Sequence, residues 1–161
     1  MSLINHRRRS DRWHGASQKV GQTAAPLFLD RIDIQCEITP VPFKDISKAA
    51  QGEPSAEIRK RVIRAREIQA ERFSGQKGIH CNAQMSERMI HQYAEPDEAG
   101  ISMLRMAMER LSLSASAYNR ILKVARTIAD LEGCEHVESH HLAEAIGYRT
   151  LDRGDWAERG I

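Results

Sequence analysis

The sequence has few aromatic residues and no long hydrophobic stretch. Only 5% of its 161 residues are Phe, Trp or Tyr, so a hydrophobic core has to be built from aliphatic side chains and Met. No apolar run approaches the roughly 20 residues that span a bilayer. The N-terminal arginines are not followed by the apolar stretch of a secretory signal. We therefore expect neither a membrane partner nor signal-directed export.

Cysteines are also scarce. The three that occur, Cys36, Cys81 and Cys134, are odd in number and far apart in the sequence. Small secreted domains that depend on disulfides usually carry an even number of cysteines at short spacings. The sequence therefore predicts a reduced, cytoplasmic protein.

No motif for nucleotide hydrolysis is present. A P-loop has the pattern Gly-x-x-x-x-Gly-Lys-Ser/Thr, whose amides, lysine and hydroxyl hold the phosphates and Mg²⁺. The segment Gly75-Gln-Lys-Gly78 lacks both the spacing and the hydroxyl, and no apolar strand ends in Asp-Glu to hold the metal. Paired carboxylates and a nucleophile–base set are missing too. We expect no catalysis by the chain in isolation, and no cofactor.

Positive charge is concentrated at the N terminus. The formal net charge is +2. Within residues 1–20, Asp11 is the only acidic residue, and the remainder of the chain is slightly acidic. The basic residues of this stretch are Arg7, Arg8, Arg9, Arg12 and Lys19. Because residues 1–26 are polar and show no periodicity, we interpret them as a disordered or poorly ordered basic tail.

Most of the remaining apolar residues follow helical spacing. Residues 32–38 alternate apolar and polar side chains and predict one β-strand, which Pro40 and Pro42 end. Helices are predicted at 55–73, about 86–93, from the region of Pro96 to Leu111, at 115–131, and at about 139–148. Short links join them. The sequence thus predicts a mainly α fold, a five-helix bundle preceded by one strand.

Two of these helices have well-defined patterns. In the helix at 115–131 the inward stripe comprises Tyr118, Ile121, Leu122, Ala125, Ile128 and Ala129. Ser114 is expected to cap its start and Gly133 to end it in the left-handed conformation. The other side of that helix carries Arg120, Lys123 and Arg126. In the helix at 55–73, Ser55 is the expected cap, and the expected inward residues are Ile58, Val62, Ala65 and Ile68. In the third helix they are Ile101, Leu104, Ala107, Met108 and Leu111.

Three segments resemble the C-terminal region of the magnesium-chelatase-like AAA+ ATPases, and within that group the ComM-like competence protein family. They are Arg-Ile-Leu-Lys-Val-Ala-Arg-Thr-Ile-Ala-Asp-Leu at 120–131, Leu-Asp-Arg-Ile-Asp at 29–33, and Glu-Ala-Ile-Gly-Tyr-Arg at 144–149 with Asp-Arg at 152–153. The resemblance covers about residues 27–156. It implies an arginine-finger turn, a last AAA+ core strand and a connector at 27–54, followed by a helical lid domain at 55–161.

The resemblance also implies a role. Intact members of the family are hexameric motors that use ATP and Mg²⁺, and ComM members are associated with DNA branch migration during natural transformation. This chain would supply the lid without the P-loop. Its implied partners are a P-loop ATPase domain or neighbouring AAA+ subunits, with DNA as a possible ligand of the intact protein.

Arg31 is the candidate catalytic residue of the turn at 29–33. The resemblance implies an arginine finger that reaches a neighbouring subunit's nucleotide in trans, where a guanidinium stabilises charge on the γ-phosphate. The alternative is a local ion pair between Arg31 and Asp30 or Asp33 that orients the loop.

The start of the helix at 115–131 departs from the family pattern. The family usually reads Ser-Ala-Arg-Ala-Tyr, and this arginine resembles the sensor-2 residue that contacts the γ-phosphate in cis. Here Ser116 takes its place, and a hydroxyl cannot make a charge-assisted bidentate contact. Arg120 lies one turn further along the same face and is the candidate to reach the same space.

Two further groups of residues have competing interpretations. Cys134, His136, His140 and His141 contain metal-binding residue types, but their spacing does not converge on one ion, so we predict capping and packing and no metal site. Arg59, Lys60, Arg61, Arg64 and Arg66 either pair with the interspersed Glu57, Glu67 and Glu71 or contact nucleic-acid phosphates. The second possibility, together with the basic tail, defines an alternative function: a free-standing helical adaptor that binds protein or DNA.

Overall fold

The computed structural model describes residues 31–36 and 52–149, and these form five α-helices and one short 3₁₀ helix. The elements are α3 (Ser55–Arg72), η1 (Asn82–Gln84), α4 (Glu87–Tyr93), α5 (Glu98–Leu111), α6 (Ala115–Glu132) and α7 (Ser139–Gly147). This confirms the predicted mainly α fold with five helices, and the predicted helix ends agree to within two residues. The basic tail at 1–26 and residues 37–51 of the connector lie outside the described residues.

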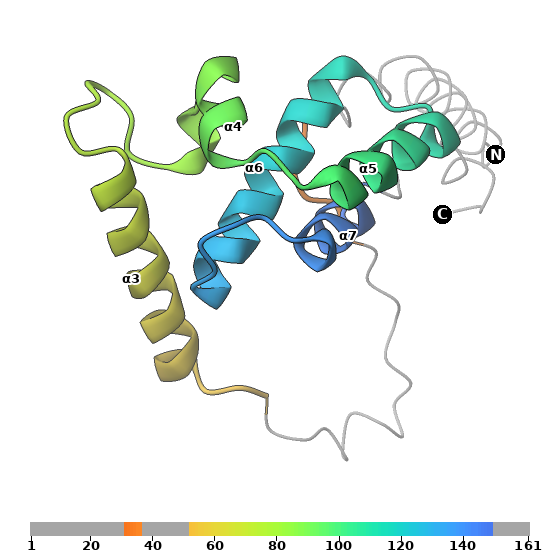
Figure 1. Ribbon diagram of the computed structural model, residues 1–161. Coiled ribbons are helices and arrows are strands. Elements are labelled where there is room, and N and C mark those ends of the chain that lie inside the picture. Colours follow the sequence, from red (N-terminus) through yellow and green to blue (C-terminus); the bar gives the residue numbers. More distant parts are fainter. Residues whose placement is uncertain (1–30, 37–51, 150–161) are drawn as a thin grey trace, which may run out of the picture.

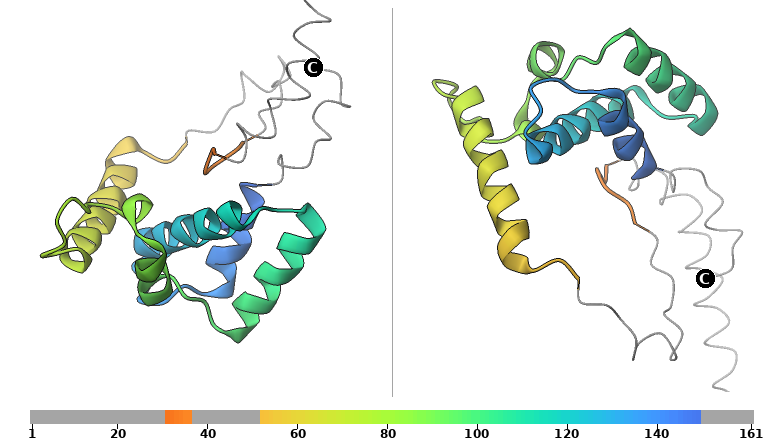
Figure 2. Two further views of the ribbon diagram at one scale, coloured as in Figure 1. Left: turned by 90° about the horizontal axis from the view of Figure 1, so that it is seen from above. Right: turned by 60° about the horizontal axis from the view of Figure 1, so that its bottom comes forward.

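Helix α6 occupies the centre of the bundle. Helix α3 lies on one side of it, while α5 and α7 lie on the other (Figures 1 and 2). Both predicted ends of α6 are confirmed: the Ser114 hydroxyl accepts a hydrogen bond from the amide of Ala117 at 3.1 Å, and Gly133 has a φ of +78°. The amide of Cys134 then donates to the Ala129 carbonyl at 2.8 Å, which closes the helix in the usual glycine-terminated way.

The core surrounds the apolar stripe of α6. Five of the six residues predicted for this stripe are buried, namely Ile121, Leu122, Ala125, Ile128 and Ala129, and the sixth, Tyr118, is partly buried against the same core. They pack in one cluster with Met89, Ile90, Leu104, Leu142 and Ala145 from the neighbouring helices. Since each fully buried Leu, Ile or Met side chain contributes about 1.5–3 kcal/mol, this aliphatic cluster is the main source of cohesion.

Helix α3 is less buried than predicted. Ile58 and Val62 are 42% and 44% exposed, whereas Ala65 and Gln69 are buried. The reason is that only the C-terminal part of α3 packs on α6, and its N-terminal part extends past the end of α6 (Figure 1). Ile101 of α5 is likewise 38% exposed.

Two predicted helix starts also need correction. Ser55 is the first residue of α3, after Pro54 in the cap position. Pro96 precedes α5, whose cap is Asp97.

The strand predicted at 32–38 is wrong for the residues that the structure describes. Residues 32–36 contain no strand, and residues 37 and 38 lie outside the described part. A strand needs a neighbouring strand to pair its backbone groups. Here the neighbour is a helix end, because the amide of Gln35 donates to the carbonyl of Tyr148, just after α7, at 3.0 Å.

Helix α5 comes very close to α7 at Gly100. A Cβ atom at this position would lie 2.7 Å from Leu142 Cδ1 and 2.8 Å from Pro96 Cβ. Leucine could turn away, but the proline ring is rigid. The absence of a side chain therefore lets Leu142 of α7 and the ring of Pro96 pack directly against the backbone of α5.

We predict that Gly100→Ala lowers the free energy of unfolding by about 1–3 kcal/mol, as expected for overpacking. The control is Gly147→Ala at the end of α7, where an added Cβ would meet nothing within 4 Å. That change should be neutral or stabilising by up to about 1 kcal/mol, because alanine favours the helix. Urea denaturation followed by circular dichroism measures both. Equal effects of the two substitutions would contradict the close approach.

Candidate functional site

Ser116 and Arg120, the two candidate residues of α6, line the same cavity. This cavity has a volume of about 290 Å³. Its other lining residues are Asp33, Ala83, Asn119 and Lys123. Ser116 and Arg120 are four residues apart, so they lie on one face of the helix. Residues from three distant parts of the sequence, the turn near Arg31, η1 and α6, meet here.

The hydrogen bonding around this cavity leaves one donor unused. Arg120 Nη1 donates to Asp33 Oδ1 at 2.7 Å, and Lys123 Nζ donates to the carbonyl of Ala83 at 2.9 Å. Arg120 Nε is buried and has no hydrogen-bond acceptor. A buried donor without an acceptor costs about 1–3 kcal/mol. With two cations against one carboxylate, the site favours an anionic oxygen as the missing acceptor.

Arg31 is exposed in a turn and does not line this cavity. Its predicted local partner Asp33 pairs with Arg120 instead, with both side chains partly exposed. The other predicted partner, Asp30, lies outside the described residues. Beside Arg31, the carbonyl of Ile32 accepts a hydrogen bond from Arg149 Nη1.

A second group of polar residues is buried between α3, η1 and α6. Its centre is the carboxylate of Asp130, which has no exposed surface. Asp130 accepts hydrogen bonds from Arg72 at 2.5 and 2.8 Å, from Asn82 at 2.7 Å, from Arg126 at 3.1 Å and from Gln69 at 3.2 Å. The carboxylate therefore connects the C-terminal part of α3, η1 and the C-terminal half of α6.

Arg126 is part of this network and is buried, which sequence analysis had not anticipated. The sequence pattern predicts it on the side of α6 that faces away from the core, but it is only 1% exposed. Its Nη1 and Nη2 atoms donate to the carbonyls of Glu135 at 2.7 Å and Cys134 at 2.6 Å. Arg126 thereby satisfies backbone carbonyls just beyond the end of α6. The i, i+4 spacing to Asp130 was the available sequence signal.

The charges in the network shift each other's ionisation. Burial alone would raise the pKa of Asp130, but hydrogen bonds from Arg72 and Asn82, with the charge of Arg126, outweigh it. The pKa of Asp130 is therefore below its usual value. Burial lowers the pKa of Arg126, and the charge of Asp130 only partly offsets this. At neutral pH, the Asp130 carboxylate of the folded protein is therefore ionised.

The sequence model of the family described as "Magnesium chelatase, subunit ChlI C-terminal" matches residues 52–149. This range contains α3 to α7, Ser116, Arg120 and the Asp130 network. The chain belongs to this family. The magnesium chelatase C-terminal region here is ComM-like, as the resemblance of the segment at 120–131 predicted.

Individual relatives support this assignment. The competence protein ComM of Haemophilus influenzae is 40% identical over 127 residues, which are 78% of this chain and 24% of that protein. The uncharacterized protein YifB of Salmonella typhimurium is 42% identical over the same shares, and protein Mb2921c of Mycobacterium bovis is 33% identical over 81% of this chain and 25% of its own length. The chain thus spans about a quarter of the length of these relatives.

In this magnesium chelatase C-terminal region, His140 and His141 meet Glu132 at the junction of α6 and α7. The Nε2 atoms of both imidazoles lie 3.0 Å from Glu132 Oε2, and the two rings are 3.9 Å apart between centroids. His136, which was considered with them, is exposed and does not join this group, and neither does Cys134. Cys134 and the two other cysteines of the chain are free thiols.

The hydrogen bonds of His141 fix its tautomer. Its Nδ1 accepts from the backbone amide of Glu138 at 2.9 Å, so the hydrogen of the neutral ring is on Nε2, which donates to Glu132. A metal ion would need the lone pair of Nε2, and binding would break the bond at Nδ1. His141 therefore caps the start of α7, which is the capping interpretation made from the sequence.

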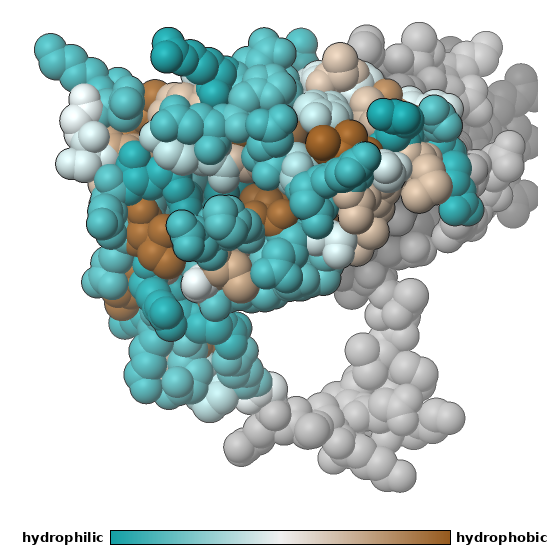
Figure 3. Space-filling view, viewed as in Figure 1, coloured by the Kyte–Doolittle hydropathy of each residue, from teal (hydrophilic) through white to brown (hydrophobic). Residues whose placement is uncertain are grey.

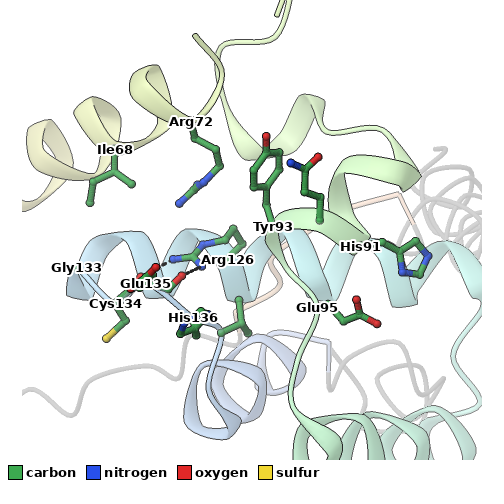
Figure 4. Close-up of a pocket in the computed structure, with 12 residues that line it drawn as sticks. Ile68, Arg72, His91, Tyr93, Glu95, Arg126, Gly133, Cys134, Glu135 and His136 are labelled. Carbon is green, nitrogen blue, oxygen red and sulfur yellow. Dashed lines mark hydrogen bonds between the residues drawn. The ribbon is translucent and has the colours of Figure 1, made fainter.

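A polar cavity of about 540 Å³ lies between α3, α4 and the loop after α6 (Figure 4). Arg72 points from α3 toward Arg126, whose bonds to the loop carbonyls are drawn as dashed lines. Because Asp130 already binds both guanidinium groups, and Glu95 and Glu135 also line the cavity, its walls offer no excess of positive charge. The geometry does not favour an anionic ligand here.

Two of the five basic residues considered on α3 form surface ion pairs. Lys60 pairs with Glu57 at 2.8 Å, and Arg61 makes a two-bond contact with Glu53. The face shown in Figure 3 is largely hydrophilic, with hydrophobic residues in separate areas. Among the described helices none is long and apolar enough to cross a membrane.

We predict that Asp130→Asn lowers the free energy of unfolding at pH 7 by about 3–5 kcal/mol, because the buried Arg126 and the partly buried Arg72 lose their counter-charge. The folded pKa of Asp130 lies below its ordinary value of 3.8. Its contribution is therefore fully present above about pH 4 and is lost as the pH falls through the folded pKa. Wild type and variant should converge in acid. Denaturant titrations at several pH values measure this.

The matched control is Asp97→Asn, since Asp97 only caps α5 by accepting from the amide of Gly100 at 2.7 Å. Asparagine caps as well as aspartate, so little change is expected. A loss at Asp130 no larger than at Asp97, or one independent of pH, would refute the proposed network.

A further prediction concerns His140. Its pKa is raised from 6.5 mainly by the hydrogen bond to Glu132. Glu132→Gln should therefore lower the pKa of His140 toward 6.5, as measured by NMR titration of the imidazole Cε1–H signal. Glu135→Gln is the control, because Glu135 makes no ion pair with His140 among the described residues. An unchanged titration in Glu132→Gln would show that the contact does not form in solution.

Proposed function

We propose that this chain is the helical lid of a ComM-like AAA+ ATPase whose phosphate-binding motif lies outside these 161 residues. Membership of the magnesium chelatase C-terminal family and coverage of a quarter of the relatives support this. So does the sequence itself, which contains no P-loop. The lid would act on ATP that a P-loop domain or a neighbouring subunit holds, and would hydrolyse none alone.

The cavity at Ser116 is the proposed point of contact with the nucleotide. The observation that carries this is the buried Nε of Arg120, a donor without an acceptor, next to Lys123 and Asn119. A γ-phosphate oxygen would supply that acceptor. Arg120 would then do the work of the arginine that Ser116 replaces. Among the described residues that line this cavity, Asp33 is the single carboxylate and already pairs with Arg120, so the metal would be held by the P-loop partner.

Arg31 is the proposed arginine finger. Its exposed position in a turn leaves the guanidinium accessible to a nucleotide on an adjacent subunit. There it would stabilise the charge that develops on the transferred phosphoryl group. ATP with Mg²⁺ supplies that group, and this chain contributes the positioned charge.

In the intact protein, lid closure over ATP would drive motion of an AAA+ ring. The name of the Haemophilus relative, a competence protein, is consistent with DNA branch migration in natural transformation as the process that this motion serves. DNA would be bound by the assembled ring, since Lys60 and Arg61 of α3 are already paired with glutamates.

The test is reconstitution. The chain is mixed with the N-terminal three quarters of the Haemophilus ComM relative, and ATP turnover is measured against that portion alone. The chain should raise turnover, and Arg31→Ala should remove about 10³-fold or more of the stimulated kcat. Arg105→Ala, on the exposed side of α5, is the matched control and should change nothing.

A second measurement restores by substitution the arginine that the family usually has at position 116. Ser116→Arg should lower the KM for ATP in the reconstituted mixture, and Arg120→Gln should raise it. Failure of the chain to associate or to alter turnover would reject the lid function. A salt-dependent shift of duplex DNA by the chain alone would then favour the helical adaptor.

A further inference from the structure

We infer that Asp33 and Arg149 are positioning residues, which fix the segment carrying Arg31 to the lid helices so that the two move as one rigid unit. This inference rests on the proposed role of Arg31 as the finger. How residues 31–36 are held is nevertheless a structural question that can be tested independently of that role. Three contacts, to α6 and to the end of α7, support the inference.

The first contact is made by Arg149, which follows α7 and has no exposed surface. Its Nη1 donates to the carbonyl of Ile32, the residue next to Arg31 in the sequence. A buried guanidinium cannot exchange this acceptor for water without opening the surrounding structure. The backbone beside Arg31 is therefore tied to the end of α7 (Figure 2).

The second contact is the hydrogen bond from the amide of Gln35 to the carbonyl of Tyr148, at 3.0 Å. Gln35 is only 8% exposed, so this bond is shielded from water. Tyr148 is itself held to α7, because its hydroxyl donates to Glu144 at 2.9 Å. Residues 32 and 35 are thus both fixed to the same helix end, on either side of Asp33.

The third contact is the ion pair of Asp33 with Arg120 at 2.7 Å, which ties the segment to α6. The side chains are 50% and 30% exposed, so this is the weakest of the three contacts. It has the most direct functional meaning. Arg120 is the residue proposed to contact the nucleotide in cis, and Asp33 lies two residues from the proposed finger in trans.

The contacts at residues 32, 33 and 35 reach both α6 and the end of α7. Rotation of this short segment against the lid would break at least one of them, so no hinge is expected at residues 32–35. When α6 and α7 move with the bound nucleotide, Arg31 moves by the same rigid displacement. One body then both senses nucleotide in its own subunit and places the finger toward the next.

The test on the full chain is ¹⁵N relaxation and amide exchange by NMR. In the wild type, the heteronuclear NOE of residues 32–35 should match that of α6, and the Gln35 amide should exchange at least tenfold more slowly than in an unstructured peptide. Arg149→Met should abolish that protection while leaving the α6 amides unchanged. Arg149→Lys, which can still donate to Ile32, should restore part of it.

Arg149→Met replaces a buried side chain, so a second variant that leaves the core intact is needed. Asp33→Asn serves this purpose, because Asp33 is half exposed. It should lower the NOE at residues 32–34 with unchanged stability. A flexible segment in the wild type, or protection at Gln35 that survives Arg149→Met, would overturn the inference.

The reconstituted ATPase separates this inference from the proposed function. Arg149→Met should lower kcat without raising the KM for ATP. The double variant Arg31→Ala/Arg149→Met should have the same kcat as Arg31→Ala alone. If Arg31→Ala has no effect while the segment is rigid, the finger role fails and the rigid unit stands. If Arg31→Ala lowers ATP turnover but Arg149→Met and Asp33→Asn leave it unchanged, the positioning role fails.

Discussion

Five hydrogen bonds converge on the buried carboxylate of Asp130, and they come from α3, η1 and α6. Removing a carboxylate from water is costly, so the arrangement is stable only when every one of these donors is in place. The positions of Arg72 and Asn82 relative to α6 are thereby fixed more narrowly than aliphatic packing would fix them. Arg126 extends the same network to the loop that leads into α7.

This constraint reaches the candidate site through α6. The helix carries Asp130 in its C-terminal half and both Ser116 and Arg120 in its N-terminal half. Its partner η1 contributes Asn82 to the network, and the next residue of η1, Ala83, lines the cavity with Arg120. Fixing α6 against η1 therefore also fixes the walls of that cavity. Function in a lid requires such rigidity, because a closing motion is useful only if the contacting residues keep their relative positions.

Local chemistry made much of the fold predictable from sequence. The five helices, the Ser114 cap, the Gly133 end and the core stripe of α6 all follow from periodicity and capping within one segment. What failed depends on distant partners. The strand predicted at 32–38 has the right alternation, but the described part of the chain supplies no neighbouring strand. Within the same residues, no helix covers the apolar side chains at the start of α3. The sequence predicts Arg126 at the surface because the periodicity of α6 does not reveal its acceptors. These are the carboxylate of Asp130, four residues further along, and two carbonyls of the following loop.

The candidate site was less predictable than the fold. Sequence reasoning singled out Ser116 and Arg120, and the structure places both on one cavity, but it missed Asp33 as the partner of Arg120. That contact joins residues 87 positions apart, and no local pattern encodes it. The same holds for Glu132, which joins the two histidines only once α7 folds back on α6.

Native-state hydrogen exchange of the whole chain, followed across low denaturant concentrations, tests most directly whether the buried carboxylate makes these helices one body. If the account is right, the slowest amides of α3, α6 and α7 open with the same free energy and the same denaturant dependence. If α3 opens at a much lower free energy while α6 and α7 stay closed, the Asp130 network does not govern the structure and the account is contradicted.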